Sequence, residues 1–454
     1  MAPRDYVVYF AQSHHEFRIP ELQSVAETFS FKFSFLREPD TSRPCMVLRL
    51  EEENARVLAR RCILIKSIYE LYGEGSSYGE IHQQTLACKE LWERFIPDAS
   101  FKFTISSFNH SISQTRQQKI VESFSYMNLQ GKIDMISPQI TFGCFEEYEC
   151  RNYAHCKKSD DDRQFTRAYF GRLIEEGSAR ALIKKFDVKK RSYLGNTSME
   201  AEISLLMANQ TLACPGKFMY DPFMGTGSMA YPVAHFGAFV FGSDIDGRQM
   251  RGKEKVPGVI RAAQQYNVSS RIVDLCTFDM TNHPWRCGGI FDAIITDPPY
   301  GVRAGAKRLG RVKEMTDAQK EVYHAHMIAR VDEKPYFPPT KPYELSQLVR
   351  DLVELARYLL KPHGRLVFFL ATVNDEYEEI DVHAMICEGM EVIANSLQDF
   401  GSWGRRLITI RKVTTDAHPP PTFVHSESTS SAPREHVPAH KDFREKYFQG
   451  FKKG

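Results

Sequence analysis

Four aspartates each follow an apolar run typical of a β-strand, and they are the residues of this sequence best suited to chemistry. Asp221 opens the stretch DPFMGTGS, Asp244 lies in GSDID, Asp279 in FDM, and Asp297 opens DPPY. Strands of an open α/β sheet bind ligands at their carboxyl ends. We therefore expect the four carboxylates to gather at one edge of a sheet, where they could pair with a cation and accept hydrogen bonds.

The turn after Asp221 is rich in glycine. Gly225 and Gly227 let the backbone approach a ligand closely. A dinucleotide site would show G-x-G-x-x-G with pyrophosphate at a helix N-terminus, but the third glycine position here is Ala230. The carboxylate of Asp221 would repel pyrophosphate and attract an ammonium group. S-adenosylmethionine (SAM) carries such a group beside its sulfonium, so the turn favours SAM over a dinucleotide.

The next two acids suit the rest of that cofactor. Asp244 lies about 20 residues beyond the turn, the spacing at which an acid binds ribose hydroxyls. Asp279 is placed to accept from the adenine amino group. Each aspartate alone also fits a helix cap or a turn. Their occurrence at three successive strand ends favours a cofactor site.

The D-P-P-Y motif suits methyl transfer to an amino group on an aromatic base. The lone pair of such a nitrogen is delocalised into the ring, and two acceptors, the Asp297 carboxylate and the Pro298 carbonyl, would direct it out of the ring plane. Pro298 and Pro299 stiffen the turn and remove competing N–H donors. Tyr300 offers a face on which a flipped base can stack. Alone, Pro-Pro after a strand also fits an ordinary loop.

A basic run follows the motif without an acid among its residues. Such a run beside a base pocket suits contacts to phosphates, which position a nucleic acid without choosing its base. A solvated loop is the alternative reading. The run comprises Arg303, Lys307, Arg308, Arg311 and Lys313.

The elements that must position these residues change character near residue 190. From there strands alternate with helices, which predicts a parallel, doubly wound α/β sheet of seven strands. Before it, two α+β units are expected, the first of ferredoxin-like character. The predicted strands are 217–223, 238–246, 271–280, 291–300, 364–371, 389–400 and 405–413, with a helix at 343–360.

Composition sets the broad class. The chain has 454 residues, 42% of them hydrophobic, and a net charge of +2, so a polyanion must be held by local basic patches. Ten cysteines lack a C-x-x-C pair, and we expect free thiols and no bound metal. The cluster Cys144, Cys150, His155 and Cys156 is the one zinc alternative, although its spacing fits no finger pattern. No run of about 18 apolar residues occurs, so we expect a soluble intracellular protein without membrane contact.

Together, NTSMEAEISLLMANQTL before the glycine turn, DPFMGTGSM itself and DPPYGVRAGAKRLGR resemble the catalytic subunits of the eukaryotic tRNA (guanosine-10-N2)-methyltransferases. This resemblance implies a ferredoxin-like unit at 1–72, a THUMP RNA-binding domain at 73–190, a class I Rossmann-like methyltransferase domain at 191–413 and a mobile tail at 414–454. The implied activity is transfer of a methyl group from SAM to N2 of guanosine 10 in tRNA.

The resemblance also implies site residues, partners and location. The residues implied to bind the methionine end of SAM are Asp221, Gly225 and Gly227. The residues implied to be catalytic are Asp297, Pro298, Pro299 and Tyr300. Expected partners are tRNA and a small zinc-binding activator protein, in the cytoplasm. The remaining cofactor residues are Thr197, Ser198, Phe223, Asp244, Ile245, Asp279 and Met280.

Two other functions remain open at this stage. D-P-P-Y supports attack by the amino group of adenine as well, so an adenine-N6-methyltransferase acting on DNA or RNA is the first. A catalytically inactive RNA-binding protein is the second. The RNA-type amino-terminal half argues against a DNA substrate, and the intact acidic motifs argue against lost catalysis.

Overall fold

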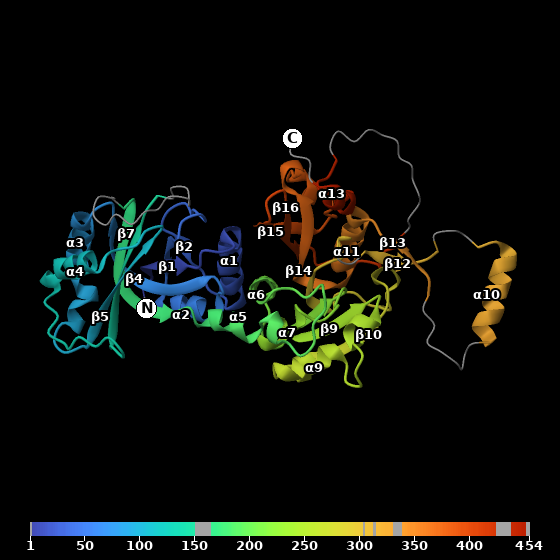
Figure 1. Ribbon diagram of the computed structural model, residues 1–454, viewed down its shortest axis with the longest axis horizontal. Coiled ribbons are helices and arrows are strands. Elements are labelled where there is room, and N and C mark those ends of the chain that lie inside the picture. Colours follow the sequence, from blue (N-terminus) through green and yellow to red (C-terminus); the bar gives the residue numbers. More distant parts are fainter. Residues whose placement is uncertain are drawn as a thin grey trace. The chain divides into compact units, whose positions relative to one another are not determined.

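A computed structural model describes residues 2–149, 165–302, 305–311, 315–329, 338–423 and 437–450 (Figure 1). The chain divides into two compact units, Met1–Ala181 and Leu182–Gly454. Several residues singled out from the sequence lie outside the described ranges: Cys150, His155, Cys156, Arg303 and Lys313.

The first unit is built on one seven-stranded sheet with the order β2-β3-β1-β4-β7-β6-β5. Its neighbouring strands are antiparallel except for the parallel pair of β5 and β6. The strands are β1 (Arg4–Phe10), β2 (Ser34–Phe35), β3 (Cys45–Leu50), β4 (Ile65–Gly75), β5 (Phe101–Phe108), β6 (Ile140–Glu147) and β7 (Arg167–Glu176). Its helices are α1 (Arg18–Thr28), α2 (Glu52–Arg61), α3 (Tyr78–Ala87) and α4 (Gln114–Ser123).

The long strand β4 joins the two predicted amino-terminal regions. It pairs with β1 on one side and with β7 on the other, so the same sheet runs through both regions. The boundary predicted between residues 72 and 73 therefore falls inside a strand, and the compact unit ends at Ala181 rather than at residue 190. A strand paired on both edges cannot be a linker, because its backbone groups are all used by the sheet.

The second unit holds a seven-stranded sheet with the order β10-β9-β8-β11-β14-β16-β15, which confirms the predicted α/β class. All neighbours are parallel except β16, which runs antiparallel to β14 and β15. The strands are β8 (Phe218–Asp221), β9 (Phe239–Asp244), β10 (Ile272–Thr277), β11 (Phe291–Thr296), β14 (Leu360–Val373), β15 (Met390–Asp399) and β16 (Trp403–Lys412).

Helices and a small two-stranded sheet complete this unit. The small sheet pairs β12 (Lys307–Leu309) with β13 (Thr340–Pro342). The helices are α5 (Ala181–Lys185), which begins at the unit boundary, and α6 (Ala201–Gln210), α7 (Ala230–His235), α8 (Gly247–Arg251), α9 (Gly258–Gln265), α10 (Asp317–Ala329), α11 (Leu345–Leu359), α12 (Ile380–His383) and α13 (Phe443–Gln449).

Helix α11 shows why this sequence folds against the sheet. Leu348, Leu352, Leu355 and Leu359 recur at three- and four-residue spacing and are fully buried. The side chain of Glu344 caps the helix by accepting from the backbone N–H groups of the first turn. These leucines belong to the core that also holds the central strands β11 and β14, so α11 fixes the strands that carry the predicted motif.

The prediction of a mobile tail at 414–454 is wrong for residues 437–450. Phe443 of α13 is 2% exposed and belongs to the core of the second unit. The Ala439 N–H donates to Asp381 at 2.9 Å, and its carbonyl accepts from the Val373 N–H at 3.3 Å. Two aromatic residues separated by four positions, Phe443 and Tyr447, both pack on Trp403. These contacts anchor a segment whose composition had suggested disorder.

Replacing Phe443 by alanine should release this segment. Loss of a buried phenylalanine costs about 3 kcal/mol or more, which is enough to undock a short helix. Hydrogen exchange should show loss of protection at the Ala439 amide in Phe443→Ala, while the amides of β11 stay protected. Phe448, on the same helix but 64% exposed, supplies the control Phe448→Ala. Equal protection in both variants would contradict the packing described here.

Candidate active site

The site lies at the point where the strand order of the second unit reverses. From β8 the chain builds outward to β9 and β10 and then returns to β11 on the other side of β8. Ligands of open α/β sheets bind at such a switch point, beyond the carboxyl ends of the strands. Asp221 ends β8 and Asp297 directly follows β11, so the first and last of the four acids flank the switch point.

A hydrogen bond joins these two strand ends. The Thr296 hydroxyl donates to Asp221 Oδ1 at 2.8 Å, and the Phe223 N–H donates to the same oxygen at 3.0 Å. Thr296 is fully buried and immediately precedes Asp297. The residue predicted to hold the cofactor is therefore attached directly to the strand end predicted to hold the reacting base.

The second oxygen of Asp221 is buried and has no hydrogen-bond partner among the described residues. Burial raises the pKa of this carboxyl to about 7, with the nearby Asp244 and Asp297 carboxylates contributing in the same direction. A buried acceptor of this kind requires a cation or a donor. The ammonium group of SAM meets that requirement.

Both glycines of the turn after Asp221 have positive φ. Gly225 has φ 49° and Gly227 has φ 80°, conformations that favour glycine. A Cβ on Gly227 would lie 2.8 Å from the Tyr231 hydroxyl oxygen. The Gly225 N–H donates to Asp244 Oδ2 at 2.9 Å, which ties the turn to the end of β9.

Asp244 therefore holds the turn as well as facing the cofactor region. Its other oxygen accepts from the Asp246 N–H at 2.8 Å, and burial raises the pKa of the carboxyl to about 6. Each carboxylate oxygen has a second lone pair. The geometry thus leaves acceptors for the ribose hydroxyls that were predicted to bind here.

Asp279 is almost wholly buried and accepts two backbone N–H donors. Thr281 donates to Oδ1 at 2.8 Å, and Leu309 of β12 donates to Oδ2. The second bond was not expected from the sequence. It places the strand β12, with the basic residues Lys307 and Arg308, against the end of the site assigned to adenine.

The segment before the glycine turn lies against that turn. Ser198 and Thr226 share a hydrogen bond of 2.9 Å between their hydroxyls. Ser228 accepts from the Met199 N–H at 3.0 Å and from the Arg191 guanidinium at 2.8 Å. Thr197, the neighbour of Ser198, is exposed. Ser198 thus contacts the glycine turn, through hydrogen bonds that also order the start of α6.

The apolar members of the predicted cofactor set border the same acids. Phe223 is partly buried and packs on the core of the second unit, and Met280 is a buried member of that core. Ile245, between Asp244 and Asp246, is partly exposed. Phe223 and Met280 thus join the acids to the apolar core, where the lower dielectric strengthens electrostatic interactions.

The D-P-P-Y motif presents its acid inward. Asp297 Oδ1 is buried without a hydrogen-bond partner in the described residues, whereas Pro298 is buried and Pro299 partly so. Burial raises the pKa of Asp297 to about 7, and Arg405 opposes that rise. The ring of Tyr300 packs edge-on against Phe443 at 6.3 Å. An unsatisfied acceptor at this position is what an incoming amino group needs.

The described part of the basic run contacts aromatic rings. The Arg308 guanidinium lies 5.5 Å from the ring centre of Tyr343, and that of Arg311 lies 4.8 Å from that of Tyr323. Lys307 is exposed. Arg308 and Arg311 are thus oriented by the rings beneath them.

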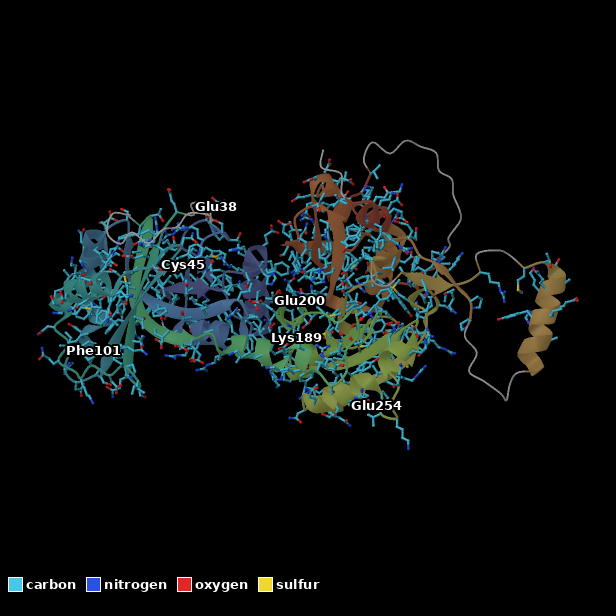
Figure 2. All side chains as sticks on the ribbon, in the orientation of Figure 1. Glu38, Cys45, Phe101, Lys189, Glu200 and Glu254 are labelled. Carbon is cyan, nitrogen blue, oxygen red and sulfur yellow. The ribbon has the colours of Figure 1, made fainter. Side chains whose placement is uncertain are left out.

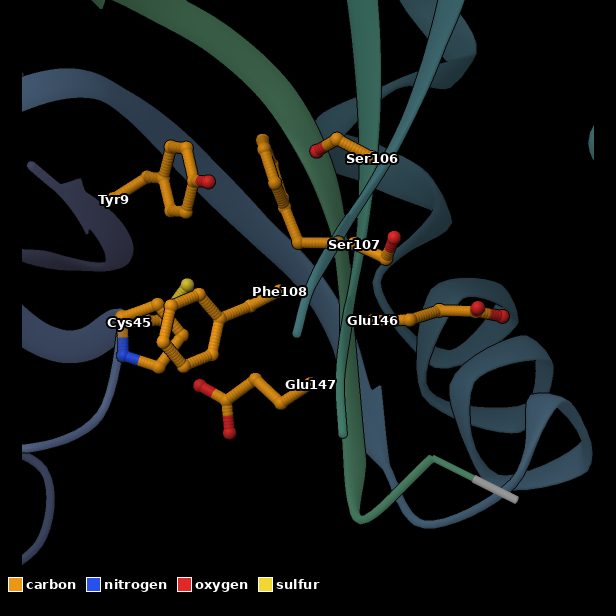
Figure 3. Close-up of a pocket in the computed structure, with 9 residues that line it drawn as sticks. Tyr9, Cys45, Ser106, Ser107, Phe108, Glu146 and Glu147 are labelled. Atoms are coloured by element: carbon orange, nitrogen blue, oxygen red, sulfur yellow. The ribbon is translucent and has the colours of Figure 1, made fainter. Parts of the chain in front are cut away.

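A small pocket in the first unit offers a contrast (Figure 3). Glu146 and Glu147 of β6 line it, and their side chains leave the strand on opposite sides. Glu146 pairs with Arg116 at 2.9 Å, and Glu147 pairs with Arg43. Because carboxylates line the pocket and use the nearby arginines, it is unsuited to bind phosphate.

Comparison with known proteins decides the family. The description "Tmrp11 THUMP N-terminal domain" matches residues 4–180, and "RMKL-like, methyltransferase domain" matches residues 189–331. The tRNA (guanine(10)-N(2))-methyltransferase of Saccharomyces cerevisiae is 34% identical over 457 residues, covering 99% of this chain and all of that protein. The chain belongs to the tRNA (guanine(10)-N(2))-methyltransferase family.

Other family members give the same result. The Homo sapiens protein, tRNA (guanine(10)-N(2))-methyltransferase TRMT11, is 34% identical, with 99% of this chain and 96% of that protein covered. Among solved structures, TrmN from Thermus thermophilus aligns with a TM-score of 0.42 and 14% identity, covering 90% of this chain and 100% of that chain. The two named relatives each align with 99% of this chain.

Sequence reasoning missed residues that the fold brings to the motif from elsewhere. Arg405 of β16 and Phe443 of α13 both lie beside Tyr300, far from it along the chain. Arg405 carried one usable signal, since strand alternation puts it on the same face as Leu407 and Thr409. Phe443 carried none that distinguished it from the other aromatics of a basic segment.

The affinity for SAM should depend on pH through Asp221. The pKa of its carboxyl is about 7 in the ligand-free chain, and pairing with an ammonium group would hold it ionised. As the pH falls below about 7, binding must remove a proton, so affinity should drop by up to about tenfold per pH unit. Calorimetric titrations at pH 6 and pH 8 measure this.

Asp221→Asn is the matched variant for that titration. It should bind SAM more weakly at pH 8 and lose most of the dependence above pH 6.5, since the asparagine does not titrate. A wild-type affinity that is constant from pH 6 to pH 8 would mean that Asp221 does not face the ammonium group.

Proposed function

We propose that this chain transfers the methyl group of SAM to the exocyclic N2 amino group of guanosine 10 in tRNA. The observation that carries the proposal is identity of 34% along essentially the whole chain to proteins named for that reaction. The arrangement of unsatisfied carboxylate oxygens at the switch point supports it independently, because it fits the cofactor on one side and an amino group on the other.

SAM supplies an electrophilic methyl group when bound, so the chain's task is to hold, orient and shield the reactants. Asp221 and the glycine turn fix the amino-acid end beside β8. Asp297, one residue beyond the Thr296–Asp221 hydrogen bond, then lies next to that end. The cofactor and the base are thus oriented by one continuous piece of backbone and one hydrogen bond.

The buried, unpartnered oxygen of Asp297 accepts a hydrogen bond from one N–H of the amino group. The Pro298 carbonyl accepts a hydrogen bond from the other N–H of the amino group. The prolines hold this carbonyl in place because they fix the geometry of the turn. Both acceptors stabilise the positive charge that develops on nitrogen as the methyl group moves. Burial makes this stabilisation stronger than it would be in water. The carboxyl must be ionised to act in this way, so turnover should fall as the pH drops below the pKa of Asp297.

The substrate is held by groups outside the acceptor pair. Tyr300 supports the flipped base, and Lys307, Arg308 and Arg311 meet the tRNA backbone. The first unit matches a THUMP description and supplies further RNA contact. Phosphate contacts add affinity without selecting a base, so the choice of guanosine 10 must come from other contacts to the tRNA.

A small zinc-binding activator protein is the second partner we propose, on the resemblance of the motifs to this family. The zinc would belong to the activator. Within the described residues no group of three or more His, Cys, Asp or Glu side chains is arranged to hold a metal, and no helix is both long and apolar enough to cross a bilayer. We also propose a cytoplasmic location, which fluorescence microscopy of the tagged chain would test.

The reaction is tested with the chain purified alone and together with the activator. Each sample receives SAM and a tRNA transcript carrying guanosine or adenosine at position 10. We expect N2-methylguanosine at position 10 of the first transcript only, and more of it with the activator. Nucleoside mass spectrometry identifies the product. Methyl on adenosine N6 would favour the alternative enzyme, and no transfer in any sample would favour an RNA-binding protein without activity.

Asp297→Asn should reduce turnover by about a hundredfold or more while SAM binding changes little, because the amide removes the negative charge but keeps the shape. Single-turnover methyl transfer and calorimetry measure the two effects. Asp292 lies at the other end of β11, paired with Lys217 and Lys361, and Asp292→Asn is the control. Parallel loss of SAM binding and turnover in Asp297→Asn would assign Asp297 to the cofactor or to folding.

A further inference from the structure

Strand β16 delivers an arginine to the D-P-P-Y motif. It runs antiparallel to β14, so its first residues lie at the edge where β11 and β14 end. Arg405 is paired with Ala371 on β14 and with Gln398 on β15. The residue is 8% exposed, which is rare for arginine and requires that its charge and donors be matched.

Four side chains hold the guanidinium in one orientation. Arg405 Nη2 donates to Glu200 Oε1 at 2.9 Å and to Gln398 Oε1 at 2.6 Å, and Nε donates to the same Gln398 oxygen at 3.1 Å. Its Nη1 donates to the sulfur of Met199 at 3.3 Å. The guanidinium also lies 4.9 Å from the ring centre of Phe369. A planar fork bound on several sides cannot rotate freely.

Two of the partners of Arg405, Met199 and Glu200, come from the segment that contacts the glycine turn. Met199 and Glu200 directly follow Ser198, which is hydrogen-bonded to the glycine turn. Glu200, labelled in Figure 2, is half exposed, and Gln398 donates to it at 2.9 Å. Arg405 therefore joins the start of α6 to the last two strands of the sheet.

The remaining interactions of Arg405 are with the motif. The Tyr300 hydroxyl is hydrogen-bonded to Arg405, and the Asp297 carboxylate lies close enough for the arginine's charge to lower its pKa against the effect of burial. Asp297 has an unpartnered buried oxygen, so Arg405 stabilises its charge without occupying that acceptor. Glu200 acts on Asp297 in the opposite direction, and its pairing with Arg405 moderates that effect.

We propose that Arg405 is a positioning residue for methyl transfer, which fixes the Tyr300 hydroxyl and keeps the Asp297 carboxylate charged and free to accept the amino group. The inference rests on the proposed function, since it names a further residue for the same reaction. Arg405 acts through Tyr300 and Asp297 and does not touch the substrate. The bond to Tyr300 sets the tilt of the ring on which the base stacks.

Two substitutions separate the charge of Arg405 from its geometry. Arg405→Lys keeps the charge but loses the fork, so kcat should fall about tenfold while the acid limb of the pH profile stays in place. Arg405→Gln loses both, so kcat should fall further and the acid limb should move to higher pH, because Asp297 then ionises less readily. In both variants KM for SAM should stay within about twofold of wild type. The readout is methyl transfer to tRNA by the complex with activator.

Tyr300→Phe tests the coupling. If Arg405 acts through the hydroxyl, Arg405→Lys should cost much less in the Tyr300→Phe background than in wild type. This comparison stays informative if Arg405→Gln does not fold, since both changes in it are conservative. Arg411 lies on the same strand in a surface pair with Glu391, and Arg411→Gln is the control that should leave kcat and the pH profile unchanged.

The outcomes separate the inference from the function it rests on. An inactive wild-type complex would remove the proposed function itself. An active wild type with Arg405→Lys and Arg405→Gln within twofold of its kcat would overturn the role of Arg405 alone. Additive effects of Arg405→Lys and Tyr300→Phe, or a rise in KM for SAM at constant kcat, would assign Arg405 to folding or to the cofactor site.

Discussion

The hydrogen bond between the Thr296 hydroxyl and the Asp221 carboxylate is the contact on which the site depends. It spans the switch point and fixes the ends of β8 and β11 to each other at 2.8 Å. Asp221 and the glycine turn follow β8, and the D-P-P-Y motif follows β11. Backbone hydrogen bonds of the sheet alone would leave some variation in the distance between these strand ends. A buried side-chain hydrogen bond restricts that distance further.

Burial makes this edge of the sheet electrostatically strained before any ligand binds. Asp221, Asp244 and Asp297 lie close together, and burial raises the pKa of each. An ammonium group bound beside Asp221 would hold that carboxylate ionised. The positive charge of Arg405 lowers the pKa of Asp297 and so opposes part of the effect of burial.

The sequence was most informative where chemistry depends on residues close together in the chain. Gly225 and Gly227 could be predicted, because positive φ and close approach leave few other residue types possible, and the strand ends followed from apolar runs that stop at an acid. The contacts of Arg405 with Tyr300 and of Leu309 with Asp279 could not, since strand order decides them and period-2 patterning does not give strand order. The boundary inside β4 failed for a related reason, because a change of composition does not reveal which strands pair.

The packing of α13 on the motif has a consequence for how the site forms during synthesis. Tyr300 gains its Phe443 neighbour only when a segment made about 140 residues later reaches the folded sheet, roughly 7 to 30 seconds after the motif at ordinary rates of translation. Until then the Tyr300 ring lacks this edge-on contact. A nascent chain can thus hold a folded sheet while the surroundings of Tyr300 are still incomplete, and the first unit, which is made earlier, has by then had time to fold.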